Sequence, residues 1–201
     1  ITFETKTSYP VSGKIEITVE TENAEKFELL IRNPNWSKTT TVTVNGEAQP
    51  VNEGYITIER EWKNGDKIEI NLDMRTEALY PIPYGHEILM NKTVWGINYM
   101  VATYDEEDPL AKHHIALRRG PVILAQENRL GYSVDDPVDV RVNGDGYVDV
   151  EFPESDITPY EHIIEVLVPL ADGTKMTVTD YASAGKLWTD ESKMAAWMLT
   201  K

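Results

Sequence analysis

Short runs in which apolar and polar residues alternate dominate the N-terminal part of the chain. Four of them lie at residues 27–32, 41–44, 55–59 and 67–72. Turn residues separate them, such as Asn33-Pro34, Asn45-Gly46 and Asn64-Gly65-Asp66. A repeat of two residues with one apolar face is typical of strands that each cover one side of a core. This region therefore predicts antiparallel sheet.

Similar runs continue to the C-terminus. They predict strands at 14–20, 96–103, 114–127, 138–142, 147–152, 162–168, 175–179 and 195–199. No segment has a sustained helical period, and only short helical turns are expected, near 108–113 and 190–193. Many short strands punctuated by Gly, Pro and Asn favour a sandwich over alternating β-α-β units. We predict an all-β protein with an antiparallel, jelly-roll-like β-sandwich.

Two irregular regions interrupt the strands, at residues 80–92 and 128–137. The first contains two prolines, a glycine and little alternation, which predicts a long surface excursion. The second is polar and ends in a proline, so we predict a domain boundary there. The resulting organisation is two consecutive sandwiches, 1–127 and 128–201. The competing interpretation is one continuous sandwich.

Composition narrows the classes of function. The chain has 201 residues, of which 41% are hydrophobic, and no cysteine. The absence of cysteine removes disulfides and thiolate chemistry and fits a cytoplasmic location. With 34 acidic and 19 basic residues, the formal net charge is −15, which disfavours nucleic acid and anionic membranes as partners. No apolar run is long enough for a transmembrane helix. The chain begins with Ile1 and lacks a signal sequence, so we expect an excised piece of a longer protein.

Candidate metal sites are weak. His113 and His114 are adjacent, and adjacent side chains on a strand point to opposite faces. The run 143–149 (NGDGYVD) imitates the first half of a calcium loop, but the strand pattern that follows favours a hairpin turn. The acidic run 104–109 is interpreted as a solvated loop. We predict no metal-binding and no cofactor-binding residue.

Catalytic patterns are also missing. No pair among the acidic residues can be singled out by spacing for glycoside hydrolysis, and no nucleophile elbow or phosphate-binding loop motif occurs. Five tryptophans and ten tyrosines could stack on sugar rings, but most are expected in the core. Trp62 is predicted to pack where two sheets meet, and Trp36 to cap an edge. We predict no catalytic residue.

Ordered motifs extend over most of residues 9–198. They are 30–36 (LIRNPNW), 42–46 (VTVNG), 54–58 (GYITI), 60–62 (REW), 65–66 (GD), 116–125 (ALRRGPVILA), 180–185 (DYASAG) and 194–198 (MAAWM). This set resembles the β-sandwich region that follows the catalytic barrel in glycoside hydrolase family 127, the β-L-arabinofuranosidase family. Residues 80–108 and 129–161 match only loosely.

The resemblance implies a non-catalytic role. In that family an N-terminal (α/α)6 barrel with a glutamate and a zinc-held cysteine nucleophile carries the reaction, and this chain has neither the helical repeat nor a cysteine. The resemblance therefore implies an accessory region that braces the missing catalytic barrel and mediates dimerisation, the parent being a glycoside hydrolase. The alternatives from other classes are a carbohydrate-binding module and a stand-alone enzyme with a carboxylate pair.

Overall fold

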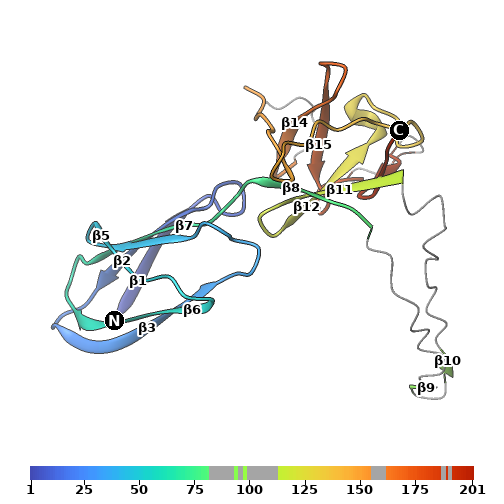
Figure 1. Ribbon diagram of the computed structural model, residues 1–201. Coiled ribbons are helices and arrows are strands. Elements are labelled where there is room, and N and C mark those ends of the chain that lie inside the picture. The colour runs from blue at the N-terminus through green and yellow to red at the C-terminus, as the bar shows by residue number, and fades with distance from the viewer. Residues whose placement is uncertain (82–92, 95–96, 99–112, 155–161, 187–188, 190–191) are drawn as a thin grey trace. The chain divides into compact units, whose positions relative to one another are not determined.

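The computed structural model describes residues 1–81, 93–94, 97–98, 113–154, 162–186, 189 and 192–201 (Figure 1). Contacts divide the chain into two compact units. Unit 1 contains Ile1–Thr76 and Arg118–Val122, and unit 2 contains Glu77–Leu117 and Ile123–Lys201. This division comes earlier in the chain than the predicted boundary at residues 127–128, because the strand that begins at Thr76 joins the sheet of unit 2.

Unit 1 is built from two antiparallel sheets. Its strands are β1 (Thr2–Thr7), β2 (Lys14–Glu20), β3 (Glu25–Asn33), β4 (Thr41–Val44), β5 (Glu47–Ala48), β6 (Gly54–Trp62) and β7 (Lys67–Asn71). One sheet has five strands in the order β1-β2-β7-β4-β5, and the other pairs β3 with β6 (Figure 1). The strands β2 and β4 have the predicted bounds.

The core of unit 1 lies between these two sheets. Its fully buried members come from both of them: Val19, Val42, Val44, Ile56, Ile58, Trp62, Ile68 and Ile70. Alternation places these side chains on one face of each strand, as the period of two requires. The Asn45-Gly46 turn between β4 and β5 has positive φ at both residues, +51° and +84°, which suits a two-residue hairpin. The sandwich predicted for this region is confirmed.

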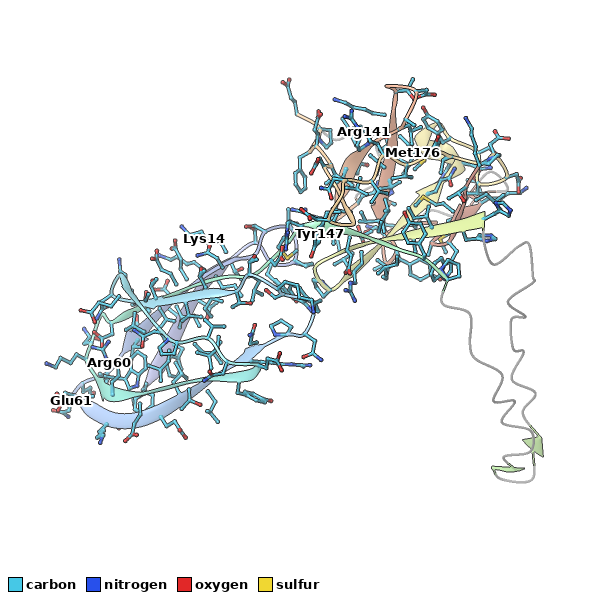
Figure 2. The ribbon with its side chains drawn as sticks, viewed as in Figure 1. Lys14, Arg60, Glu61, Arg141, Tyr147 and Met176 are labelled. Atoms are coloured by element: carbon cyan, nitrogen blue, oxygen red, sulfur yellow. The ribbon has the colours of Figure 1, made fainter. Side chains whose placement is uncertain are left out.

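Unit 2 is organised around one larger sheet. Its strands are β8 (Thr76–Leu79), β11 (His114–Arg119), β12 (Val122–Glu127), β13 (Tyr147–Val148), β14 (Glu165–Pro169), β15 (Lys175–Asp180), β16 (Met194–Ala195) and β17 (Met198–Leu199). The order is β13-β8-β11-β12-β15-β14, while β16 pairs with β12 and β17 with β11. Met176, labelled in Figure 2, is fully buried. A short pair, β9 (Thr93–Val94) with β10 (Ile97–Asn98), is also described.

Several predicted elements differ in detail. The run 114–127 is two strands, because the chain turns at Gly120, whose φ is +55°. The predicted strand 138–142 is reduced to isolated bridges at Val138 and Val140. The predicted strand 147–152 is reduced to β13 with a bridge at Glu151. Most of the predicted excursion at 80–92, the strand at 96–103 and the helical turns at 108–113 and 190–193 fall outside the described residues.

The predicted all-β class is confirmed. Among the described residues a 3₁₀ turn, η2 (Asn128–Leu130), ends at Gly131 in the left-handed region, and His113 also has 3₁₀ conformation. None of the helices in the described part of the chain has the length and apolar character needed to cross a membrane.

Candidate functional site

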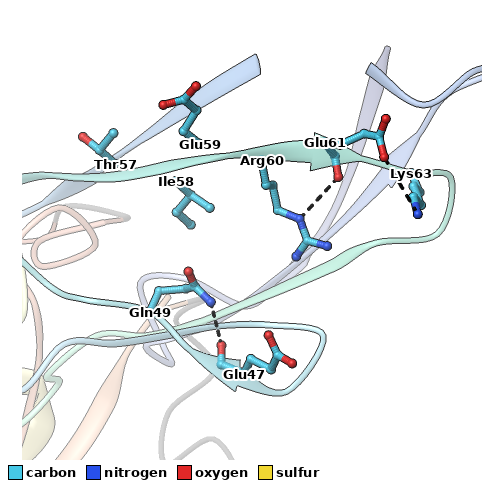
Figure 3. A pocket seen from close by; sticks show the side chains of 8 residues that line it. All are labelled: Glu47, Gln49, Thr57, Ile58, Glu59, Arg60, Glu61 and Lys63. Carbon is cyan, nitrogen blue, oxygen red and sulfur yellow. Dashed lines mark hydrogen bonds and ion pairs between the residues drawn. The ribbon is translucent and has the colours of Figure 1, made fainter. Parts of the chain in front are cut away.

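An open hollow of about 600 Å³ lies on unit 1 beside β5 and β6 (Figure 3). Its lining is mainly polar and charged: Glu47, Gln49, Thr57, Ile58, Glu59, Arg60, Glu61 and Lys63. The charges largely compensate one another. Lys63 Nζ lies 3.9 Å from Glu61, and Arg60 lies 5.3 Å above the Trp62 ring and 3.7 Å from Asp66. We interpret the hollow as a solvated surface, because its cations already have anionic partners within the unit.

A close-packed junction within unit 1 surrounds Met74. A Cβ on Gly120 would lie 2.5 Å from Met74 Sδ and 3.4 Å from the Trp36 ring, and a Cβ on Gly13 would lie 2.8 Å from Met74 Cγ and 2.3 Å from the Leu72 carbonyl oxygen. At Gly13 the backbone oxygen of Leu72 leaves no room for a Cβ, whereas Gly120 lies against the flexible end of Met74 and favours glycine through its positive φ. Gly120 and Gly13 therefore both allow close packing around Met74.

Hydrogen bonds fasten the same junction. Arg119 Nη1 donates to the Met74 carbonyl, and burial lowers the pKa of Arg119. The Asp73 N–H donates to Ser37 Oγ at 2.8 Å, while Arg75 Nη2 donates to Asp73 Oδ2 at 2.6 Å. The hydrogen bonds from Arg75 lower the pKa of Asp73, against the opposing effect of burial. These contacts fix the backbone around Met74.

A cluster of buried charged side chains lies inside unit 2. Glu127 is fully buried and forms an ion pair with Arg129 through its Oε1 atom. His162, about 1% exposed, lies between two carboxylates: its Nδ1 is 2.5 Å from Glu165 Oε1 and its Nε2 is 3.9 Å from Glu127 Oε2. We call these four residues, Glu127, Arg129, His162 and Glu165, the buried charge cluster. Such groups are kept inside a protein only when they are paired.

The buried charge cluster holds the segment that follows β15. Glu127 Oε2 accepts the Gly185 N–H at 3.1 Å, and Arg129 Nη2 donates to the Lys186 carbonyl at 2.8 Å. At the start of this segment, Asp180 Oδ1 accepts the Ser183 N–H at 2.9 Å. These hydrogen bonds fix the position of the backbone at Gly185 and Lys186.

Asp180 also joins this segment to the chain before β14. Its Oδ2 accepts the N–H groups of Ile163 and Ile164, both at 3.1 Å. The Ile163 N–H lies 3.2 Å from Ser183 Oγ as well. The run 180–185 is therefore a turn whose polar side chains hydrogen-bond to the backbone of the chain before β14.

The sequence-based hypotheses have mixed outcomes. Trp62 packs between the two sheets of unit 1, stacks on Phe27 at 5.6 Å and donates from Nε1 to the Phe27 carbonyl, as predicted. The segment 143–146 is a turn, in which Asn143 Oδ1 accepts the N–H groups of Asp145 and Tyr147 and Gly146 has φ +83°. The predicted hairpin is not formed, because β13 pairs with β8 and not with the residues before the turn.

Other predictions stay open. No group of three or more His, Cys, Asp or Glu side chains with metal-binding geometry occurs among the residues that the structure describes. Trp36 is half-buried near Gly120, and its predicted place at an edge stays a prediction. His86, Trp95, Trp188 and the acidic run 104–109 lie outside the described residues.

Sequence reasoning missed the buried charge cluster. One signal was present: in β12 both faces are buried after Ile123, so a glutamate at the end of an apolar run indicates a buried carboxylate. The sequence could not show that Arg129 and His162 approach Glu127. His162 is distant from Glu127 in sequence, and the run 162–168 was interpreted by alternation alone.

Comparison with known proteins identifies the N-terminal part. Residues 1–74 match the family model described as Beta-L-arabinofuranosidase, GH127 middle domain. The matched residues are therefore similar to this middle domain. They coincide with unit 1 apart from its last two residues and the returning segment 118–122. A comparison with curated proteins gives no match.

Solved structures extend the likeness to the whole chain. A GH127 β-arabinofuranosidase matches 99% of the chain at 18% identity with a TM-score of 0.64. A GH127 β-L-arabinofuranosidase from Geobacillus stearothermophilus T6 matches 99% at 22% identity with a TM-score of 0.58, and a glycoside hydrolase matches 98% at 18% identity with a TM-score of 0.58. The chain spans about a third of these structures, at 31%, 30% and 32%. Over nearly its whole length, the chain therefore has the fold of part of these structures.

Proposed function

We propose that this chain is the accessory β-region of a GH127-type glycoside hydrolase and that it braces a catalytic region outside these residues. The observation that carries the proposal is the combination of the middle-domain match over residues 1–74 with structural coverage of nearly the whole chain by GH127 structures three times its length. A β-sandwich supplies a rigid, strand-ordered surface for such a role.

The described polar groups support a bracing role. The strongest convergent side chains, in the buried charge cluster, are occupied with backbone groups of their own unit. The open hollow of unit 1 has charges that compensate one another. Fixed, internally paired polar groups maintain a shape, whereas catalysis needs groups that reach a reacting atom.

The experiment compares the full-length parent protein with a form lacking residues 1–201 and with the isolated 201-residue chain. We expect the isolated chain to release no sugar from a β-L-arabinofuranoside, and the truncated parent to lose thermal stability and activity. Release of sugar by the isolated chain after removal of contaminating enzyme would contradict the non-catalytic assignment. Unchanged stability and activity of the truncated parent would contradict bracing.

Self-association belongs to the same proposal, because the family resemblance implies dimerisation. Analytical ultracentrifugation of the full-length parent over a range of concentrations, with and without residues 1–201, tests it. A dimer that is lost on truncation supports this role. A monomer at all concentrations, or a dimer that survives truncation, removes it.

One observation favours a second candidate, a carbohydrate-binding module. Tyr181 is 52% exposed and stands at the start of the turn that Asp180, Glu127 and Arg129 hold in place. An exposed aromatic ring on a fixed backbone is a common way of stacking on a sugar. Calorimetry of the chain with arabinan and arabinogalactan oligosaccharides tests this, with Tyr181→Ala as the variant. Binding that Tyr181→Ala abolishes would favour the module, and no binding would remove it.

A further inference from the structure

The core residues of unit 1 are fully buried on one side of the unit and only partly buried on the other. Its fully buried residues come from β4, β6, β7 and the end of β2. The partly buried residues that pack against them include the whole inward row of β3, with two residues of β2: Phe27, Leu29, Ile31, Ile15 and Ile17. The inward side chains of β3 therefore retain solvent contact, although they belong to the core face.

The half-open side coincides with the outer edge of the smaller sheet. Within the described ranges β3 pairs only with β6, so its other edge presents unpaired backbone N–H and C=O groups over nine residues. On the facing sheet, β1 is the edge strand, and all six of its residues are exposed. Phe3 of β1 is 43% exposed and meets Phe27 edge-on, with ring centroids 6.4 Å apart. An apolar strip thus runs along β1, β2 and β3.

The opposite side of the same unit is different. Along β6 and β5 lies the open hollow, lined mainly by polar groups, with Glu61 and Lys63 as neighbours of opposite charge (Figure 3). The core residues behind it, Ile56 and Ile58, are buried. Apart from Leu72, which follows β7, the partly exposed core positions lie on β2 and β3.

We propose that the outer edge of β3 takes up a further strand from the part of the GH127 polypeptide outside this chain. That strand pairs with the β3 backbone and lays its apolar side chains over Phe3, Ile15 and Ile17. Addition of a strand to an exposed edge is a common recognition mode, in which backbone hydrogen bonds hold the strand and alternate side chains fill the apolar strip. This inference rests on the proposed bracing function and identifies the outer edge of β3 as the surface that contacts the rest of the polypeptide.

A segment of the same polypeptide is favoured over a second copy of this chain. The matched structures are about three times longer than the region that this chain covers, so most of such a polypeptide lies outside it. A covalently linked segment has a high effective concentration at the edge. A second copy would bring another formal charge of −15, and Glu25, Lys26 and Glu28 place charges along β3 that discourage pairing between identical edges.

Hydrogen exchange tests the backbone part of the proposal. Peptides covering Glu25–Asn33 are compared by mass spectrometry between the full-length parent and the 201-residue chain. We expect exchange in this strand to be at least about tenfold slower in the parent, because amide groups at the edge gain partners. Peptides covering Glu47–Ala48, beside the hollow, serve as the internal control and should be unchanged. Equal exchange of β3 in both proteins overturns the proposal.

Matched substitutions test the apolar part. Phe3→Glu places a charge on the strip, whereas Tyr55→Glu places one on the outward face of β6, where the ring is 58% exposed. We expect Phe3→Glu to lower the Tm of the full-length parent by about 4 °C more than that of the 201-residue chain, and Tyr55→Glu to have the same small effect in both. Phe3→Leu, which keeps the position apolar, should leave the Tm of the full-length parent close to that of the unmodified protein. Equal effects of Phe3→Glu in the two proteins overturn the proposal.

The outcomes separate this inference from the proposed function. If removal of residues 1–201 destabilises the parent but β3 exchanges equally with and without the remaining polypeptide, bracing holds and the surface is elsewhere. If the 201-residue chain forms a dimer that Phe3→Glu dissociates, the occupant is a second copy and the proposal is wrong. If removal has no effect on the parent, bracing itself fails.

Discussion

The two units are both all-β, yet they fill their interiors differently. The core cluster of unit 1 consists of hydrophobic residues alone, and the buried Asp66 and Asp73 lie in the connections next to β7. Unit 2 takes the buried charge cluster inside, where Glu127 is fully buried beside Arg129 and His162. Burial of apolar side chains stabilises a fold without requiring a particular orientation. A buried ion pair is costly unless every partner is in place. Unit 2 thus depends on particular polar partners.

The largest effect is expected in the apolar core of unit 1. Trp62 is fully buried and stacks on Phe27, so Trp62→Ala should lower the free energy of unfolding by about 3 to 5 kcal/mol. Urea denaturation of the 201-residue chain measures this. Trp197→Ala is the matched control, because Trp197 is 48% exposed, and should change stability little. A loss below about 1 kcal/mol for Trp62→Ala would contradict the picture of a tightly packed core.

The second prediction concerns the buried charge cluster. Glu127→Gln leaves Arg129 buried without a carboxylate, and should lower the free energy of unfolding by about 2 to 3 kcal/mol. The double variant Glu127→Met with Arg129→Met should recover much of this loss, because it removes both charges. Asp135→Asn breaks the exposed pair with Lys193 and is the control, expected to have a small effect. If the double variant is less stable than Glu127→Gln, the charged groups stabilise the fold beyond compensating for each other's burial, which contradicts the prediction.

A third test separates packing from backbone conformation in unit 1. Gly120→Ala introduces a Cβ within 2.5 Å of Met74 Sδ at a residue with φ +55°. Gly65→Ala has φ +85° but nothing within 4 Å, so it isolates the cost of the conformation. We expect losses of about 2 kcal/mol and about 1 kcal/mol respectively. Equal losses in thermal denaturation would show that the Met74 junction adjusts without cost.

The smallest predicted effect is a pH dependence in unit 1. Hydrogen bonds from Arg75 lower the pKa of Asp73, so this residue contributes stability above its unfolded pKa of about 4, and the contribution is lost as pH falls through the lower folded value. Burial opposes the corresponding shift at Asp66, but hydrogen bonds from Asn45 and Lys63 outweigh it, so its pKa is also lowered and the sign is the same.

The variant Asp73→Asn should be less stable than wild type at pH 7, by about 1 kcal/mol, and should approach wild type on acidification. Unfolding curves from pH 7 to about pH 2 measure the difference. A difference that grows as pH falls would contradict the assigned direction of the Asp73 shift.

Unit 1 was the easier region to predict. The alternation of β2 and β4 and the Asn45-Gly46 turn depend on neighbouring residues, and the predicted bounds of these two strands were correct. The break at Gly120 was missed, because the apolar residues before Arg118 and after Gly120 were joined into one strand, although Gly120-Pro121 is a pair typical of turns. The apolar strip along β1, β2 and β3 could not be predicted either, because the alternation of apolar and polar residues does not determine the order of strands in a sheet.

The sequence by itself determined the local properties of this protein: its strands, several of its turns, its all-β class and its likeness to GH127. These follow from side-chain alternation and from φ preferences, which act between near neighbours. Only the tertiary structure decided which polar residues meet. Glu127 ends β12 and His162 lies in the segment before β14, so their approach depends on how the sheet of unit 2 is ordered. It likewise decided that β3 is an edge, because an edge is defined by the absence of a neighbour among the described strands.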